Sequence, residues 1–249
     1  MMLLIDSGNT RIKWAIVKGV DWLCSGILPV AQAGELSQHL AGSCDLPGKS
    51  LNVIEQVWVS NVAGEVVARH ISNIDVGKNV KIQFIVAQPE QCSVRNGYSQ
   101  PAQLGSDRWA ALLGAWHLVG EECLVVSCGT ATTIDTLSAK GEFTGGLILP
   151  GVELMLNSLC ATTAGLKPGR GKYVPFPDNT ADAIFSGAIQ ASCGAIQRQH
   201  ALFDRGNTPV VLSGGAAGAL HDHLMMPLRV VDNLVLQGLL MIAQEASVA

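Results

Sequence analysis

LLIDSGNT at residues 3–10 and LVVSCGTA at residues 124–131 follow one pattern. Each stretch begins as an apolar strand, bends at a turn that contains glycine and small hydroxyl residues, and continues into a second strand. Aligned without gaps, the stretches superimpose two pairs of residues, Asp6 with Ser127 and Gly8 with Gly129. Eight residues with three or four matches can agree by chance, so the surrounding elements must decide whether the chain is duplicated.

The elements expected around the two stretches also repeat. In the first half, hydrophobic periodicity and breaker residues predict three strands, a helix, a strand, a helix and a strand, at 2–6, 11–17, 22–28, 32–40, 56–60, 64–73 and 81–86. The second half is expected to hold three strands, two helices, and then a strand, helix, strand and helix, at 123–126, 132–137, 142–149, 152–161, 181–203, 209–213, 216–223, 228–231 and 234–245. The shared β-β-β-α-β-α-β order predicts an α/β protein with an internal duplication.

A long segment separates the two sets of elements. Residues 87–105 are rich in Pro, Gly, Gln and Asn and are predicted to form a long loop, which in a compact domain is usually functional or a linker. Ser106 can cap the helix that follows, through residues 108–118. We therefore expect two domains, residues 1–117 and 118–249.

Composition excludes several classes of function. Of the 249 residues 48% are hydrophobic and 14% are charged, so the chain can bury a sizeable core. A formal net charge of −4 argues against a nucleic-acid binder that relies on phosphate neutralisation. No run of about 18 uncharged apolar residues occurs, so we expect no membrane span.

The start of the chain and the cysteines favour a cytoplasmic protein. The first residues, MMLLIDSGNTRIK, lack the basic leader and the long apolar stretch of a signal peptide. Seven scattered cysteines without a C-x-x-C pair argue against a zinc site and a disulfide framework.

The first turn, Asp6 to Arg11, has the residues of a phosphate site. Gly8 lets the backbone approach a ligand closely, and successive N–H groups in a turn can surround an anion. Asn9 and Thr10 add neutral donors, and Asp6 can hold a hydrated Mg²⁺. A simple hairpin turn accounts for the hexapeptide equally well. The chain has no Walker A loop.

The second turn, Gly129 to Thr133, offers hydroxyl groups in place of charges. These groups can bond phosphate oxygens, and two such hairpins that face each other would grip a phosphate tail. The alternative is a Thr-rich strand, for which Thr has good propensity. Because a similar turn occurs in the first half, the phosphate-binding interpretation is favoured.

Three further segments carry candidate chemistry. Asp107 at a helix start can accept a proton from a substrate hydroxyl, or it can be a helix-terminal charge only, and taken alone the second reading is simpler. Arg108 can bind an anion, while Tyr98 can contact a substrate or anchor its loop. Gly151 is read as a site of close backbone packing. Gly214 begins a strand-to-helix turn suited to a nucleotide's sugar or base.

The ordered motifs resemble the type III pantothenate kinases, also described as Bvg-accessory-factor-like proteins, of the superfamily of acetate and sugar kinases, Hsp70 and actin. The motifs span nearly the whole chain and are DSGNTRIK, RNGY, LGSDRW, SCGTATTIDT, GGLILPG and NTADAIFSGA. The resemblance implies two ribonuclease H-like halves, each a mixed five-stranded sheet flanked by helices, with the active site in the cleft between them. It also implies ATP-dependent phosphorylation of pantothenate to 4′-phosphopantothenate, the first step of coenzyme A biosynthesis.

The resemblance assigns roles to particular residues. Asp107 would accept the proton of the pantothenate hydroxyl, and Asp6 would hold Mg²⁺ through water. ATP would contact the first hairpin and one residue of the second, namely Asp6, Ser7, Gly8, Asn9, Thr10, Arg11, Ile12, Lys13 and Thr130. The pantothenate site would be lined by Tyr98, Gly105, Ser106, Asp107, Arg108 and Thr180.

The resemblance also implies a homodimer and a monovalent cation. Many relatives have Asp where this chain has Ser127, and that Asp helps to bind the activating cation. The site of the cation, K⁺ or NH₄⁺, therefore stays open. The alternatives to a pantothenate kinase are another small-molecule kinase of the same superfamily, and a catalytically impaired regulatory protein that has kept the fold.

Overall fold

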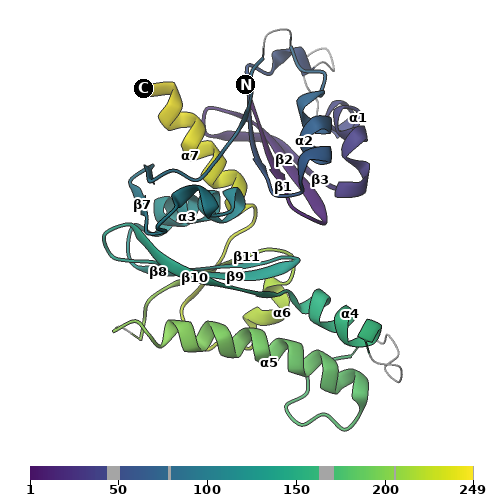
Figure 1. Ribbon diagram of the computed structural model, residues 1–249, viewed down its shortest axis with the longest axis vertical. Coiled ribbons are helices and arrows are strands. Elements are labelled where there is room, and N and C mark those ends of the chain that lie inside the picture. Colours follow the sequence, from purple (N-terminus) through teal and green to yellow (C-terminus); the bar gives the residue numbers. More distant parts are fainter. Residues whose placement is uncertain (44–50, 78–79, 163–170, 205, 249) are drawn as a thin grey trace. The chain divides into compact units, whose positions relative to one another are not determined.

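The computed structural model describes residues 1–43, 51–77, 80–162, 171–204 and 206–248, and it divides into two compact units (Figure 1). Unit 1 comprises Met1–Leu118 and Asn233–Ala249, and unit 2 comprises Val119–Asp232. The chain passes from unit 1 to unit 2 within one residue of the boundary expected from sequence. The C-terminal helix differs from that expectation, because it belongs to unit 1.

Unit 1 contains a mixed sheet of five strands, β1 (Met2–Ser7), β2 (Arg11–Lys18), β3 (Asp21–Pro29), β4 (Gln56–Asn61) and β5 (Ile82–Phe84). Their order is β3-β2-β1-β4-β5. The hairpin partners β1–β2 and β2–β3 are antiparallel, whereas β1–β4 and β4–β5 are parallel. Side chains of β1 and β2 are buried on both faces, so the sheet is covered on both sides.

Helices cover both faces of this sheet. On one face, α1 (Leu36–Ser43) and α2 (Glu65–Ser72) contribute Leu36, Leu40, Val67 and Ile71 to a core with Leu3, Ile5, Ile12 and Trp14. On the other face, α7 (Leu234–Val248) packs on β1, β2 and β4. Figure 1 shows α1 and α2 on one side of β1–β3 and α7 on the opposite side. Short 3-10 turns complete the connections, η1 (Val30–Glu35), η3 (Leu51–Val53) and η4 (Pro101–Gln103).

The helix α3 (Ser106–Val119) lies against α7 because glycine allows their backbones to approach. A Cβ atom at Gly238 would collide with the carbonyl oxygen of Ala110, and one at Gly114 would lie 2.8 Å from the carbonyl oxygen of Leu234. This close crossing explains why the last helix returns to unit 1. A linear division of the sequence does not reveal such a contact.

The segment expected as a long loop contains a short hairpin, β6 (Glu90–Gln91) and β7 (Val94–Asn96). Its turn residues have left-handed backbones, with φ of 48° at Cys92 and 63° at Ser93. Glu245 of α7 holds the turn by accepting a hydrogen bond of 2.9 Å from the backbone N–H of Cys92. Two-residue strands are too short for periodicity to reveal, and Cys-Ser is not a sequence typical of such a turn.

Unit 2 repeats the plan of unit 1. Its strands are β8 (Cys123–Cys128), β9 (Ala131–Leu137), β10 (Glu142–Pro150), β11 (Val210–Ser213) and β12 (Leu228–Val230). They follow the order β12-β11-β8-β9-β10, with β8–β9 and β9–β10 antiparallel and β8–β11 and β11–β12 parallel. Each strand therefore has a counterpart of the same direction in unit 1. The predicted duplication and the predicted mixed sheets are confirmed.

The helices of unit 2 are α4 (Val152–Thr162), α5 (Thr180–His200) and α6 (Ala217–His221). Residues of α5 and α6 form a core with the strands, including Ile189, Ile196, Leu220, Val126 and Leu212. Figure 1 shows α5 and α6 on the same side of β8–β11. Within the described residues, no helix combines the length and the apolar character needed to cross a lipid bilayer.

The cysteines depart in one respect from the sequence-based expectation. Cys24 in β3 is disulfide-bonded. Free thiols are found at Cys92, Cys123, Cys128, Cys160 and Cys193.

Candidate active site

The first hairpin joins β1 to β2 in unit 1 and has an exposed tip. The strands end at the pair Ser7 and Ile12, and the N–H of Gly8 donates to the carbonyl of Arg11 at 3.1 Å. Side chains at Asn9, Thr10 and Arg11 are exposed to solvent. Ser7 and Ile12 are fully buried, and the Oγ atom of Ser7 has no hydrogen-bond partner among the described residues.

Asp6 lies one residue before the end of β1, on the face of the sheet opposite the core of Ile5 and Ile12. The strand pairing sets Asp6 beside Lys13 on β2 and Ser60 on β4. Burial, and then the nearby carboxylate of Asp107, raise the pKa of Asp6 to about 7, although Lys13 acts in the opposite direction. Two carboxylates therefore come close enough to repel each other.

The start of α3 is fixed beside Asp6 by a bond between two hydroxyl groups. Ser60 Oγ and Ser106 Oγ lie 2.9 Å apart, which ties the first residue of α3 to the end of β4. The Oδ1 atom of Asp107 accepts a hydrogen bond of 2.8 Å from the backbone N–H of Arg108. Gly105 leaves the necessary space, since a Cβ atom there would lie 2.7 Å from the same carboxylate oxygen.

Arg108 is buried and meets Tyr98 from the preceding loop. The guanidinium Nη1 donates to the Tyr98 hydroxyl at 3.2 Å, and its central carbon lies 5.9 Å from the ring centroid. Asn96 orders this loop, because its side chain accepts from the N–H of Tyr98 and donates to the carbonyl of Pro101. The guanidinium of Arg108 and the phenol of Tyr98 therefore form one ordered pair.

The second hairpin joins β8 to β9 in unit 2 and is one residue shorter. The strands end at the pair Cys128 and Thr132, and the N–H of Gly129 donates to the carbonyl of Ala131 at 3.0 Å. Thr130 stands exposed at the tip.

Hydroxyl groups follow one row across unit 2 behind this tip. Strand pairing aligns Ser213 of β11, Ser127 of β8 and Thr133 of β9. Thr133 is buried, and its Oγ1 atom has no hydrogen-bond partner in the part of the chain that the structure describes. The same is true of Thr132.

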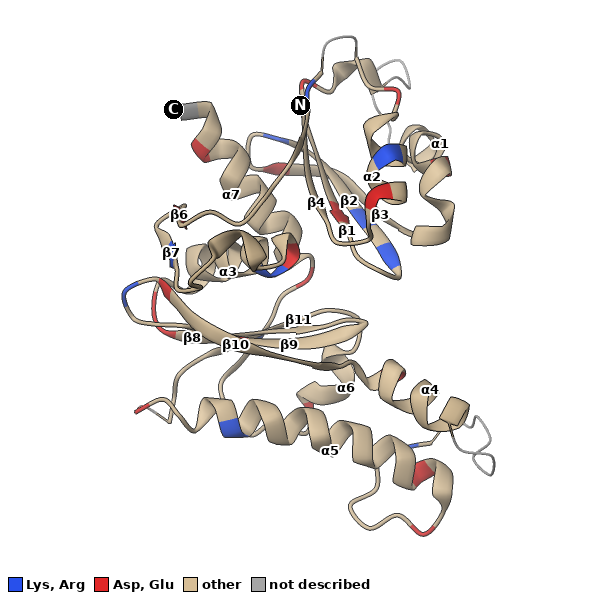
Figure 2. Ribbon diagram, viewed as in Figure 1, with Lys and Arg blue, Asp and Glu red and all other residues tan. Residues whose placement is uncertain are grey.

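Charge is distributed unequally between the hairpins, and Figure 2 shows how sparse charged residues are on the strands of unit 2. The strands β1 and β2 carry four charged residues, Asp6, Arg11, Lys13 and Lys18. The strands β8 and β9 carry one, Asp135.

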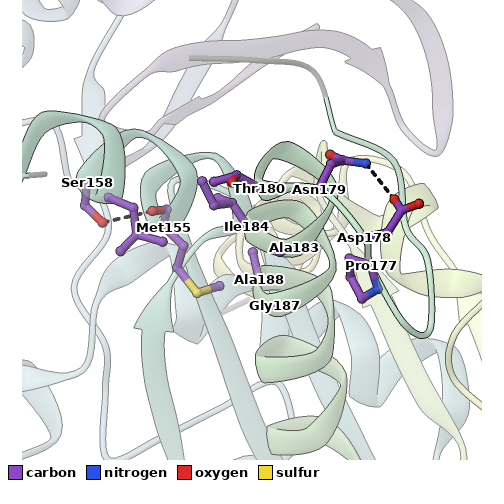
Figure 3. A pocket seen from close by; sticks show the side chains of 11 residues that line it. Met155, Ser158, Pro177, Asp178, Asn179, Thr180, Ala183, Ile184, Gly187 and Ala188 are labelled. Carbon is purple, nitrogen blue, oxygen red and sulfur yellow. Dashed lines mark hydrogen bonds between the residues drawn. The ribbon is translucent and has the colours of Figure 1, made fainter. Parts of the chain in front are cut away.

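Thr180 begins α5 in unit 2 and lines a pocket of about 810 Å³ between α4 and α5 (Figure 3). Asn179 caps the helix by accepting from the N–H of Asp182 at 3.0 Å, and its amide donates back to the Asp182 carboxylate at 2.9 Å. The bond from the N–H of Lys172, and then that from Asn179, hold the pKa of Asp182 below its usual value. Thr180 therefore projects from a well-ordered helix start.

The structure thus brings most expected site residues together within unit 1. Asp6, Lys13 and Asp107 form one charged group, and Arg108 with Tyr98 extends it along α3. Thr130 and Thr180 belong to unit 2. Sequence reasoning missed Ser60, which links Asp6 to α3 and is separated from Ser106 by 46 residues. No local motif marks such a contact.

Comparisons with known proteins point to one family. The profile of the type III pantothenate kinase family matches residues 2–201. A type III pantothenate kinase of Nitrosospira multiformis is 46% identical over 250 residues, which cover 99% of this chain and 92% of the relative.

Solved structures confirm the expected fold. A Baf family protein from Campylobacter jejuni has a TM-score of 0.66 at 23% identity, covering 99% of this chain and all of that chain. The (R)-2-hydroxyglutaryl-CoA dehydratase component A of Acidaminococcus fermentans has a TM-score of 0.58 at 12% identity, covering 99% and 98%. With a family match over most of its length and a full-length relative at 46% identity, this chain belongs to the type III pantothenate kinase family.

Proposed function

We propose that this pantothenate kinase moves the γ-phosphoryl group of ATP to the hydroxyl of pantothenate, with Asp107 as the proton acceptor. The activity is that of its family. The observation that carries the residue assignment is the approach of Asp107 to Asp6 beside an exposed hairpin of phosphate-binding character. Positioning and electrostatic stabilisation account for most catalysis in phosphoryl transfer, and this part of unit 1 offers both.

Asp107 is suited to accept a proton. Its pairing with the N–H of Arg108 holds the carboxylate in one orientation, and Ser60 fixes the helix that carries it. A base oriented in this way typically accelerates a reaction by about 10² to 10⁴. Arg108 and Tyr98 would bind the anionic end of pantothenate, since a guanidinium bonds a carboxylate at two points.

A divalent cation fits the position of Asp6. The raised pKa of Asp6 results from burial and from the Asp107 charge, and a cation would offset both. Mg²⁺ prefers a carboxylate and water ligands, so Asp6 would hold it through water. When bound with ATP, Mg²⁺ neutralises charge on the phosphate oxygens.

The phosphates of ATP would lie against the first hairpin. The backbone N–H groups at the tip, together with Asn9, Thr10, Arg11 and Lys13, supply neutral and cationic donors. Ser7, Gly8 and Ile12 would contribute further contacts, and Thr130 would add its hydroxyl from the second hairpin.

A monovalent cation, K⁺ or NH₄⁺, would assist without an acidic ligand at Ser127. The Oγ1 atom of Thr133, buried without a partner on the same row, is one neutral oxygen that suits such an ion. Turnover measured in K⁺, NH₄⁺ and a large organic cation tests this assignment. Equal rates in all three would exclude it.

The active form would be a homodimer that buries the apolar residues of unit 2 around Thr180. Leu154 and Leu159 on α4 are exposed by 45% and 43%, and Phe176 before α5 is exposed by 92%. Such a surface suits a second copy of the chain, with pantothenate bound near the interface. Light scattering coupled to size exclusion should give about twice the 26.1 kDa mass of the chain.

Release of ADP is the deciding experiment for the reaction. The purified protein is incubated with ATP and Mg²⁺, with and without pantothenate, in K⁺ or NH₄⁺ buffer. We expect ADP only when pantothenate is present. ADP release with another hydroxylated acceptor instead would indicate a different kinase, and no release with any acceptor would indicate a regulatory protein.

A further inference from the structure

Residues 128–130, which are the end of β8 and the first two residues of the second hairpin's turn, are enclosed by two glycines that are distant in sequence. Gly151 precedes α4 and Gly214 follows β11, and both lie in unit 2 with the hairpin. We call this arrangement, residues 128–130 with Gly151 and Gly214, the glycine clasp.

Gly151 touches the turn from the start of α4. Its N–H donates to the carbonyl of Thr130 at 2.9 Å, and its own carbonyl accepts the first hydrogen bond of α4, from Met155. A Cβ atom at position 151 would collide with the carbonyl oxygen of Gly129 and would lie 2.6 Å from that of Thr130. Both obstacles are backbone atoms, which cannot rotate away as a side chain can. Any residue larger than glycine must therefore displace the turn or the helix.

Gly214 touches the turn from the strand-to-helix connection after β11. Its φ of +102° suits glycine, and a Cβ atom there would lie 2.7 Å from the carbonyl carbon of Cys128. Two residues later, Ala216 donates its N–H to the Cys128 carbonyl at 3.1 Å. The turn is therefore bonded through its carbonyls on both sides, at Cys128 and at Thr130.

The glycine inside each turn is equally open, since a Cβ atom at Gly129 would meet only the Ala131 carbonyl oxygen, at 3.6 Å. A Cβ atom at Gly8 would meet only the Arg11 carbonyl oxygen, at 3.5 Å, which is ordinary contact. Nearby bonds do tie the ends of the first turn, from Val62 to Ser7 and from Val30 to Thr10. These bonds come from residues that carry side chains, whereas the two glycine positions of the clasp leave room for none.

We propose that Gly151 and Gly214 are positioning residues for the nucleotide, which hold the Thr130 turn in the orientation that receives ATP. The inference rests on the proposed function, because Thr130 is its nucleotide contact in unit 2. A turn without charge has only its hydroxyl and backbone groups to offer. Because hydrogen bonds weaken steeply when misaligned, such a turn has to be held in place.

The first test compares the same substitution at two glycines. Gly151→Ala adds a methyl group that collides with the turn, whereas Gly194→Ala adds one to an exposed position of α5 with no atom within 4 Å. ADP release is measured while ATP and pantothenate are varied in turn. We expect Gly151→Ala to raise the KM for ATP by about tenfold or more and to raise the KM for pantothenate by a much smaller factor. Gly194→Ala should match the wild-type protein.

The split between the two KM values distinguishes positioning from general damage. A purely structural role would lower the thermal midpoint or the active fraction and would leave the KM for ATP unchanged. A folded Gly151→Ala protein whose KM for ATP stays within about twofold of wild type would therefore overturn the proposal.

A second measurement uses the wild-type protein in case Gly151→Ala does not fold. Amide hydrogen exchange is followed with and without a non-hydrolysable ATP analogue. We expect slower exchange at the N–H groups of Gly151 and Ala216, which bond the turn. Unchanged exchange at saturating analogue would contradict the clasp. If the analogue slows exchange but pantothenate elicits no ADP, the reaction assignment fails and the clasp stands.

Discussion

The two hairpins of the molecule share one backbone plan and differ in how they can hold a ligand. In each, the residue before the strand end is paired across the hairpin, Asp6 with Lys13 and Ser127 with Thr133. The first pair is charged and lies beside a second carboxylate, while the second pair is neutral. The glycine inside each turn has open space around it, but the second turn is also enclosed by the two glycines of the clasp.

The difference indicates that the two hairpins acquired different roles after the duplication. Charge in unit 1 can bind a metal ion and accept a proton, but two neighbouring carboxylates destabilise the protein when no cation is present. A neutral turn in unit 2 has no such repulsion between charges. Its binding of a ligand depends instead on the placement of its backbone groups. Substitutions that remove a charge should therefore reduce activity most in unit 1. Substitutions that displace the backbone should reduce activity most in unit 2.

The largest effect is expected from Asp107→Asn. The amide keeps the shape of the side chain and cannot accept the proton, so kcat should fall by about 10² to 10⁴. Circular dichroism and the thermal midpoint should show a folded protein. Asp21→Asn, at an exposed acid of β3, is the matched control and should be silent. Near wild-type turnover of Asp107→Asn would remove this residue from its role.

A second effect is a dependence of stability on pH that comes from Asp6. Its pKa is raised in the folded protein from 3.8 to about 7, so the folded state holds this proton more tightly than the unfolded chain. The corresponding stability is present below about pH 4 and is lost as the pH rises through 7. The shift corresponds to about 4 kcal/mol at most.

Urea unfolding at pH 5 and pH 8.5, without divalent cations, measures this term. The free energy of unfolding of the wild-type protein should decline relative to that of Asp6→Asn over this interval, because the variant has no carboxyl group to ionise. Mg²⁺ should reduce the decline. A constant difference between the two proteins across pH would show that Asp6 keeps its ordinary pKa.

A smaller effect is expected from Thr130→Val, which removes one hydroxyl group and keeps the branched shape. Loss of a single neutral hydrogen bond of about 0.5–1.5 kcal/mol should raise the KM for ATP by about two- to tenfold. Thr10→Val is the matched substitution in the first hairpin. It should matter less, since the first hairpin also carries the cationic side chains of Arg11 and Lys13. A larger effect at Thr10 than at Thr130 would reverse the proposed roles of the two hairpins.

Sequence reasoning predicted the repeated plan because strands such as β1 and β8 are continuous apolar runs that end at glycine turns. It did not place α7 in unit 1, since that contact depends on Gly238 facing Ala110, and isolated helix patterns carry no partner information. At the candidate site, sequence reasoning identified the residues that are neighbours within one motif. The contact between Ser60 and Ser106 was missed, because it is created by the fold.

The two glycines of the clasp show why the remainder was hard to predict. A strand followed by Pro150 and Gly151 is common, and the sequence shows only that close packing is allowed there. The atoms that require glycine belong to residues 128–130, which are brought to it by the pairing of β9 with β10. Chain topology, and not a local pattern, gives this glycine its role.

The smallest expected effect comes from Ser127→Asp, which gives the second hairpin the carboxylate that the first has at Asp6. If a monovalent cation binds near the Ser127 and Thr133 row, the added charge should lower the K⁺ concentration for half-maximal activity by several-fold. Ser127→Asn, which adds similar bulk without charge, should leave that concentration unchanged. Equal K⁺ dependence in both variants would mean that the cation does not bind beside this row. A lower K⁺ requirement in Ser127→Asp alone would show that the neutral pair costs the enzyme cation affinity.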